Sequence, residues 1–381
     1  MRYLISVFLF LTLMNCQKKD YKPEFIKAEI IPSKIDSLNS EKEVQAFVNQ
    51  LKHPFYEQKL SQDSVIIYRK FEEFELKKIS EFKRSCEYDE DSITKKIADS
   101  LKINDTYYKA DFDNNGYTDL LIIGDNHNCA STRGCETCDE CDGPKNLKYI
   151  SCDFSIYSLM NFENDSINDI NLNFITKNLS LVPKIIETQN GSFIELHTPK
   201  EYNPENGELE IVNKTIPIIY KYGTFIERNQ KEKDYDIENI EFVAQGCVAG
   251  CPEFIISIDK NQNGKFNAIN YNWFDKDFSH DLEDNDINGE FKTKISDEHF
   301  NELYGIINYL DFPNLNNSYY SGAMHSSSII LKITYNGGKL KIIKDYGLTG
   351  TYGLKRVYQM FHEMRFNQEW RKKNTTNIVY N

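Results

Sequence analysis

The sequence predicts an α+β fold made of two domains, each an antiparallel sheet with helices packed on one face. Short β-branched and aromatic segments recur through residues 151–222 and are separated by Asn, Gly and Pro turns. The second half of the chain has the order strands, helix, hairpin, helix. Apolar residues stand at helical spacing in only a few segments, which we expect near residues 40–51, 71–82, 92–101, 296–310 and 354–364.

Length and charge restrict the kinds of partner that we expect. The chain has 381 residues, of which 40% are hydrophobic, and this is enough for two ordinary domains with cores of their own. Asp and Glu together number 58, against 45 Lys and Arg, which gives a formal net charge of -13. Because phosphate contacts need a basic face, this balance argues against a nucleic-acid partner.

The first 16 residues form a short export segment. Arg2 is followed by an apolar run that ends before Cys16 and is shorter than the roughly 20 residues of a membrane-spanning helix. The segment resembles a bacterial lipoprotein signal, which implies that Cys16 becomes the lipidated first residue. An ordinary secretory signal and an uncleaved anchor are the alternatives. The resemblance implies a lipid-anchored protein of the bacterial cell envelope, at the outer membrane, with the membrane as its partner.

Composition shifts divide the rest of the chain. Residues 17–39 are polar and charged, as expected of a tether, and residues 227–236 are charged without apolar periodicity, as expected of a linker. The predicted parts are a signal peptide (1–16), a tether (17–39), an N-terminal α+β domain (40–226), a linker (227–236), a C-terminal domain (237–372) and a tail (373–381).

An Asp-rich loop precedes the apolar strand at residues 120–123. Its oxygen-bearing side chains alternate around Gly116, and hard cations such as calcium need six to eight oxygen ligands. The loop resembles the Asp-rich loops of integrin-type and propeller-repeat calcium sites and the first half of an EF-hand loop, although position 12 is Ile122 rather than Glu. Calcium is the only cofactor that the sequence favours, and the alternative is a hairpin turn in which these side chains bind backbone amides. The candidate ligands are Asp111, Asp113, Asn115, Tyr117 and Asp119.

A cysteine cluster follows the Asp-rich loop. The cluster contains Cys129, Cys135, Cys138, Cys141 and Cys152, and His127 lies beside it. Eight cysteines remain once Cys16 is set aside, and an even number in an exported protein favours disulfides. The CxxCxxC run at residues 135–141 can also bind zinc or part of an iron–sulfur cluster. Disulfides are the first interpretation, and zinc is the alternative.

A second thiol pair lies in the turn Gly246-Cys247-Val248-Ala249-Gly250-Cys251-Pro252. A strand rather than a helix follows, so the helix dipole that lowers thiol pKa values in redox CxxC motifs is missing. We therefore expect a structural disulfide between Cys247 and Cys251. This turn, the strand after it, the Asn263-Gly264 hairpin and Ser296 before a helix resemble the domain of unknown function 6438 of bacterial lipoproteins, over about residues 237–370. The resemblance implies a fold and a lipoprotein context, and no mechanism.

The chain lacks the GxSxG, HExxH and phosphate-loop motifs. We therefore expect an envelope-anchored, non-enzymatic binding or structural module, whose protein or small-molecule partner the sequence does not identify. The alternative is a thiol–disulfide or metal-handling envelope protein that uses the cysteine cluster. Mass spectrometry under non-reducing conditions separates the two, because oxidised thiols favour the first interpretation and free thiols with bound zinc favour the second.

Overall fold

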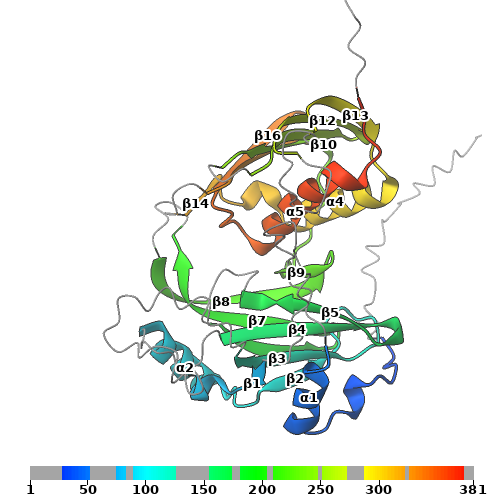
Figure 1. Cartoon of the computed structure of the whole chain (residues 1–381). Coiled ribbons are helices and arrows are strands. Elements are labelled where there is room, and N and C mark those ends of the chain that lie inside the picture. Colours follow the sequence, from blue (N-terminus) through cyan, green and yellow to red (C-terminus); the bar gives the residue numbers. More distant parts are fainter. Residues whose placement is uncertain are drawn as a thin grey trace, which may run out of the picture.

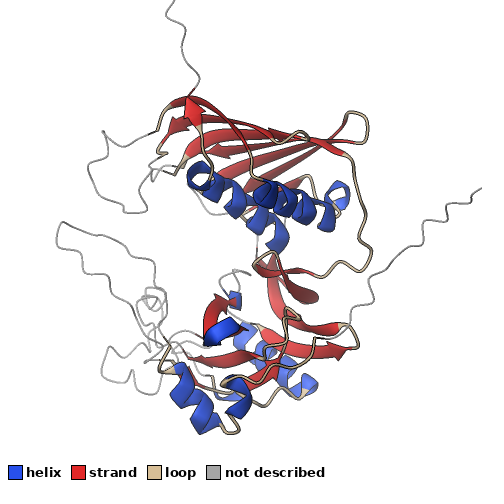
Figure 2. Ribbon diagram, turned by 90° about the vertical axis from the view of Figure 1, so that its right-hand side faces the viewer, coloured by secondary structure: helices blue, strands red, loops and turns tan. Residues whose placement is uncertain are grey.

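The computed structural model describes residues 28–51, 74–82, 89–125, 154–173, 181–203, 209–247, 251–272, 287–321 and 326–372. Within these ranges the strands form three sheets of five, four and eight strands. Nearly all the pairings are antiparallel, and the helices are few (Figure 1, Figure 2). The fold is therefore a sheet-rich α+β fold, in agreement with the predicted class. No helix of the described residues is long and apolar enough to cross a membrane.

The five-stranded sheet is built around a strand that is buried on both faces. It contains β1 (Glu75–Leu76), β2 (Tyr107–Ala110), β3 (Asp119–Asp125), β4 (Phe154–Phe162) and β5 (Ser166–Asn171). The order is β1-β3-β4-β5, and β2 also pairs with β3. Successive side chains of β3 point to opposite faces. Leu120 and Ile122 pack with helix α1 (Glu41–Val48), whereas Leu121 and Ile123 pack with helix α2 (Asp89–Leu101).

The four-stranded sheet covers the second face of β3. Its strands are β6 (Val182–Thr188), β7 (Gly191–Tyr202), β8 (Leu209–Lys221) and β9 (Thr224–Glu227), in that order. Ile194 and Phe225 of this sheet lie in one hydrophobic cluster with Leu121 and Ile123. The prediction of one sheet with helices on a single face is therefore wrong for the N-terminal half. The two sheets share a core, because a continuous apolar strand has to be covered on both sides.

The prediction of a helix at residues 71–82 is also wrong for residues 74–82, the part that the structure describes. Residues 75–76 form β1, which pairs with β3, and residues 79–81 form the short 3-10 helix η3. Gln45 of α1 explains the extended conformation. Its Nε2 donates to the carbonyl of Phe74 (2.7 Å), and its Oε1 accepts from the backbone N–H of Leu76 (2.7 Å). A long-range amide pair thus overrides the local helical pattern.

The eight-stranded sheet has helices on one face, as predicted. Its order is β14-β16-β15-β10-β11-β12-β13-β17, and only β14 and β16 are parallel among its pairs. Helices α4 (Asp297–Tyr309) and α5 (Tyr352–Asn367) lie against the same face (Figure 1). The strands are β10 (Ile237–Gln245), β11 (Glu253–Asp259), β12 (Asn263–Asn270), β13 (Gly289–Lys294), β14 (Ser318–Tyr320), β15 (Ser328–Tyr335), β16 (Lys339–Tyr346) and β17 (Arg371–Lys372).

Capping residues fix where the helices begin. The Oγ of Ser296 accepts from the N–H of His299 at the start of α4, and Thr351 caps α5 in the same way through the N–H of Leu354. The apolar side of α5 then packs on the sheet, where Phe361 stacks on Phe242 with ring centroids 4.6 Å apart. The other short helices of the described residues are η1 (Ile35–Ser37), η6 (Glu163–Asp165) and η7 (Phe312–Asn314).

Candidate metal centre

The Asp-rich loop joins β2 to β3 and is closed by its own side chains. Asp111 accepts hydrogen bonds from the backbone N–H groups of Asn115 (3.1 Å) and Gly116 (2.9 Å). Asn115 Oδ1 accepts from the N–H of Tyr117 (2.7 Å). Asn114 and Gly116 have positive φ values of 59° and 90°, which suit Asn and Gly. The loop therefore turns sharply and brings its alternate side chains to one side.

Three carboxylates meet inside this turn. Asp111, Asp113 and Asp119 each offer one oxygen, and these oxygens all lie within 4.8 Å of one another. Asp119 opens β3 and is fully buried, whereas Asp111 and Asp113 are half-buried. The structure thus brings together three of the five predicted ligands, with hard oxygen donors of the type that calcium prefers.

Asn115 and Tyr117, the other two predicted ligands, hold the loop together. Asn115 Nδ2 donates to Asp113 Oδ2 (3.0 Å) and to the carbonyl of Asn161 (2.9 Å). Tyr117 follows Gly116 and forms a parallel β-bridge with Ile31. The side-chain oxygen of Asn115 is already occupied by the N–H of Tyr117, so this residue shapes the loop in the present structure.

Burial and the neighbouring negative charges raise the pKa values of two of the carboxylates, Asp113 and Asp119. Burial raises the pKa of Asp119 to about 8, and the charges of Asp113 and Asp111 add to the rise, while backbone N–H donors from Asn161 and Phe112 oppose it. Burial, followed by the charge of Asp111, raises the pKa of Asp113 to about 6. Negative charges this close resist simultaneous ionisation, and a divalent cation among them would favour the ionised forms.

Asn161 of β4 belongs to the same cluster and was missed by the sequence analysis. Its backbone N–H donates to Asp119 Oδ1 (2.7 Å), and its Nδ2 donates to the carbonyl of Thr118 (3.2 Å). The residue is 1% exposed, and its Oδ1 has no hydrogen-bond partner within the described residues. No local pattern marks this residue, because it reaches the loop only through the pairing of β3 with β4.

A second oxygen-rich turn, between β11 and β12, forms an ordinary hairpin. Asp259 Oδ1 accepts from the backbone N–H groups of Asn261 (2.9 Å) and Asn263 (3.0 Å), and both of its oxygens accept from Asn263 Nδ2. Among the described residues, no further acidic side chain joins Asp259 in a metal-binding group. This loop is therefore a useful comparison for the Asp-rich loop at residues 111–119.

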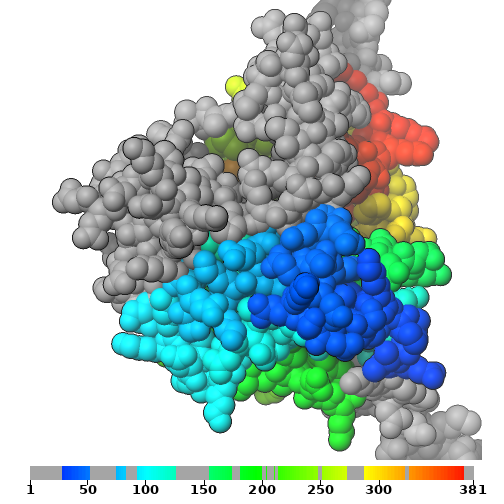
Figure 3. Space-filling model, turned by 60° about the horizontal axis from the view of Figure 1, so that its bottom comes forward, coloured from blue at the N-terminus to red at the C-terminus, as the bar shows by residue number. Residues whose placement is uncertain are grey.

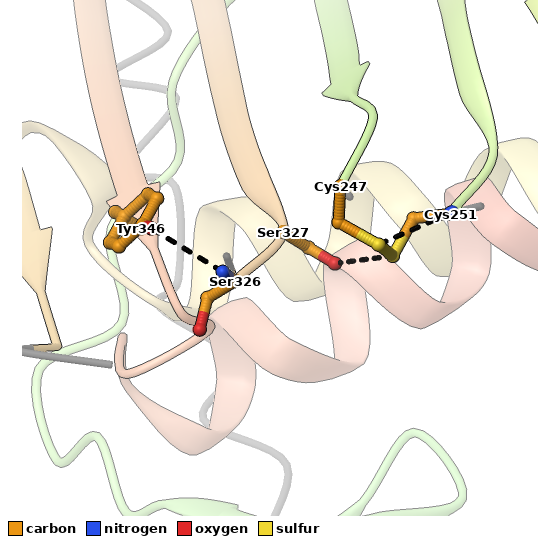
Figure 4. The surroundings of a disulfide bond; sticks show 5 residues. All are labelled: Cys247, Cys251, Ser326, Ser327 and Tyr346. Carbon is orange, nitrogen blue, oxygen red and sulfur yellow. Dashed lines mark hydrogen bonds between the residues drawn. A yellow bond between two sulfur atoms is a disulfide. The ribbon is translucent and has the colours of Figure 1, made fainter. Parts of the chain in front are cut away.

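Cys247 and Cys251 form the expected disulfide, with Cα atoms 5.1 Å apart (Figure 4). The N–H of Cys251 donates to Cys247 Sγ (3.2 Å), and Ser327 Oγ donates to Cys251 Sγ (3.3 Å). The bond links the end of β10 to the start of β11. The other predicted thiols, together with Cys86 and His127, lie outside the described residues: Cys16, Cys129, Cys135, Cys138, Cys141 and Cys152.

The disulfide lies in a region that has a known family pattern. Residues 238–365 match DUF6438, a domain of unknown function. The match begins in β10 and ends in α5, so it confirms the resemblance expected over about residues 237–370. No curated protein and no solved structure matches the chain.

The DUF6438 region and the Asp-rich loop are separate features. The DUF6438 match covers the disulfide and the sheet with helices α4 and α5, whereas the loop at residues 111–119 lies outside it. The DUF6438 match therefore does not account for the carboxylate cluster. That cluster has to be interpreted from its own geometry.

Proposed function

We propose that this protein is a lipid-anchored module of the bacterial envelope, at the outer membrane, that binds or supports a partner without catalysis. The signal-like segment that ends at Cys16 supports the anchor, and the missing catalytic motifs support the non-enzymatic role. We further propose a calcium site at residues 111–119 that stabilises the N-terminal half. One observation carries the calcium assignment: the oxygens of Asp111, Asp113 and Asp119 face one another within 4.8 Å.

The surroundings of the three carboxylates favour a bound cation. Only one residue of the group, Asp119, is fully buried, and it accepts two backbone hydrogen bonds, with no ion pair to a cationic side chain among the described residues. Lys109 lies near the loop but donates to the carbonyls of Asp36 and Leu38. Asn161 adds a buried amide oxygen without a partner in the described residues. Calcium would neutralise the charge and accept such oxygens as ligands.

Titration calorimetry of the purified protein with calcium chloride tests the site. We expect the unaltered protein to bind calcium and an Asp113→Asn variant to bind at least about tenfold more weakly. Asp259→Asn is the matched control, since it changes the other Asp-rich turn and should bind calcium like the unaltered protein. Absence of calcium binding, or equal binding by Asp113→Asn, would overturn the assignment.

Metabolic labelling with radioactive palmitate tests the anchor. We expect label on the unaltered protein and none on a Cys16→Ala variant, because the lipid is attached at Cys16 in the proposed mature form. A Cys247→Ser variant serves as the control and should keep the label, since its altered thiol lies in the disulfide. The anchor is disproved by an unlabelled wild-type protein or by equal label on Cys16→Ala.

A further inference from the structure

Residues 28–31, the first described residues of the predicted tether, lie on the Asp-rich loop. The N–H of Ala28 donates to Asn114 Oδ1 (3.1 Å), and the N–H of Ile31 donates to the carbonyl of Gly116 (2.8 Å). Ile31 and Tyr117 also form a parallel β-bridge. In Figure 3 the blue residues 28–51 lie at the surface of the molecule. The segment that comes from the proposed membrane anchor therefore attaches to the proposed calcium loop.

This attachment is weaker than that of the residues that follow. Ile35 is 1% exposed and belongs to the core cluster of β3 and α1, so the chain is held firmly from that point onward. By contrast, Ile30 and Ile31 are 61% and 42% exposed. With little apolar burial, residues 28–31 depend on their hydrogen bonds to the loop. Segments of this kind open locally at low free-energy cost.

One residue of the loop, Gly116, hydrogen-bonds both to the segment and to a carboxylate of the cluster. The N–H of Gly116 donates to Asp111 Oδ2, while the carbonyl of the same residue accepts from Ile31. Gly116 is also in close contact with the segment, because a Cβ built there would lie 2.7 Å from the carbonyl oxygen of Glu29. The position of Gly116 is thus fixed both by Asp111 and by the segment at residues 28–31. A ligand that orders Asp111 orders the partner of Ile31 as well.

We propose that cation binding by Asp111, Asp113 and Asp119 is coupled to docking of residues 28–31, so that calcium fixes the membrane-proximal segment to the folded body. This inference rests on the calcium site proposed above. Docking of the segment would change the distance that the chain between Cys16 and the folded body can span. A chain from Cys16 to Ala28 spans at most about 40 Å, whereas a chain that is free up to Ile35 spans at most about 65 Å. Calcium would hold the folded body closer to the membrane.

Hydrogen–deuterium exchange of the full chain, with and without calcium, tests the coupling in one direction. We expect the amides of Ala28 and Ile31, which donate to the Asp-rich loop, to exchange about fivefold more slowly, or slower still, when calcium is bound. Calorimetry on the same sample establishes whether calcium binds. Bound calcium with unchanged exchange in this segment overturns the coupling and leaves the calcium site intact. Absence of calcium binding overturns both.

A proline substitution tests the coupling in the other direction. Ile31→Pro removes the N–H that donates to Gly116 and alters none of the three carboxylates. Because coupling between two equilibria is reciprocal, the variant should bind calcium more weakly by the same factor by which calcium slows exchange. Ile30→Pro is the matched control, since no described hydrogen bond uses the Ile30 N–H, and it should bind calcium normally. An unchanged calcium affinity in Ile31→Pro would contradict the coupling.

Discussion

The carboxylate of Glu227 accepts a hydrogen bond from the backbone N–H of Gly353, with a distance of 3.0 Å between Glu227 Oε2 and the Gly353 nitrogen. Its Oε1 accepts from the N–H of Tyr352 at 2.6 Å. The two donors belong to the first turn of α5, where backbone N–H groups have no partner inside the helix. Glu227 ends β9 of the four-stranded sheet, so it ties that sheet to a helix of the DUF6438 region.

Replacing Glu227 with Ala should lower the free energy of unfolding by about 1–2 kcal/mol, because the variant leaves two helix-terminal donors without an acceptor and removes a negative charge from the positive end of the helix dipole. Urea denaturation measures the loss. Glu232→Ala is the control: Glu232 pairs with Lys221 at the surface, and its loss should cost less than about 0.5 kcal/mol. Equal stability of the two variants would contradict a capping role for Glu227.

Gly116→Ala should destabilise the protein more than Gly337→Ala. Both glycines have positive φ, 90° and 79°, so each substitution carries a backbone cost of about 1 kcal/mol. A Cβ at Gly337 meets no atom within 4 Å, whereas a Cβ at Gly116 lies 2.7 Å from the Glu29 carbonyl oxygen. The difference between the two melting temperatures isolates this contact. Equal melting temperatures would mean that residues 28–31 move aside without cost.

Local rules predicted the elements that local interactions determine. Ser40 caps α1 through the N–H of Glu43, and Ser296 caps α4, at the start of two helices that the apolar spacing predicted near residues 40–51 and 296–310. The hairpin around Asn263-Gly264 is also present. An Asn-Gly pair usually forms the two central residues of a hairpin turn, but here it does not. Gln262 takes the positive φ of 65° in the turn, while Gly264 lies in β12. A Cβ at Gly264 would lie 2.9 Å from the Cδ1 atom of Ile295, so the glycine leaves room for this side chain.

Contacts between residues far apart in the sequence could not be predicted from these local patterns. The shared core of the two N-terminal sheets depends on which face of β3 meets β7, and no pattern within either strand states this. For the candidate site, spacing predicted the three carboxylates because one short loop carries them all. Asn161 follows Asp119 by 42 residues and reaches the loop through strand pairing. The capping role of Glu227 could not be predicted for the same reason, because Glu227 and Gly353 of α5 are 126 residues apart in the sequence.

Removing the disulfide by Cys247→Ala together with Cys251→Ala should lower the free energy of unfolding by about 2 kcal/mol, as the loss of a short cross-linked loop predicts. The strands β10 and β11 remain paired without it, so the fold should persist. Urea denaturation measures the loss. Ser327→Ala removes only the hydrogen bond to Cys251 Sγ and should cost less than about 1 kcal/mol. If the double variant is as stable as Ser327→Ala, the disulfide does not lock the turn.

Acidification should destabilise the protein partly through His362. Burial, together with the charge of Arg365, lowers the pKa of this imidazole to about 4, since its ring lies between Phe242 and Phe254. The folded state therefore holds the neutral ring, and its contribution to stability is present above about pH 6.5 and is lost as the pH falls towards 4. His362→Phe keeps an aromatic ring and removes the titration, so its melting temperature should fall less between pH 7 and pH 5. The same fall in the His362→Phe variant would assign the acid sensitivity to other groups.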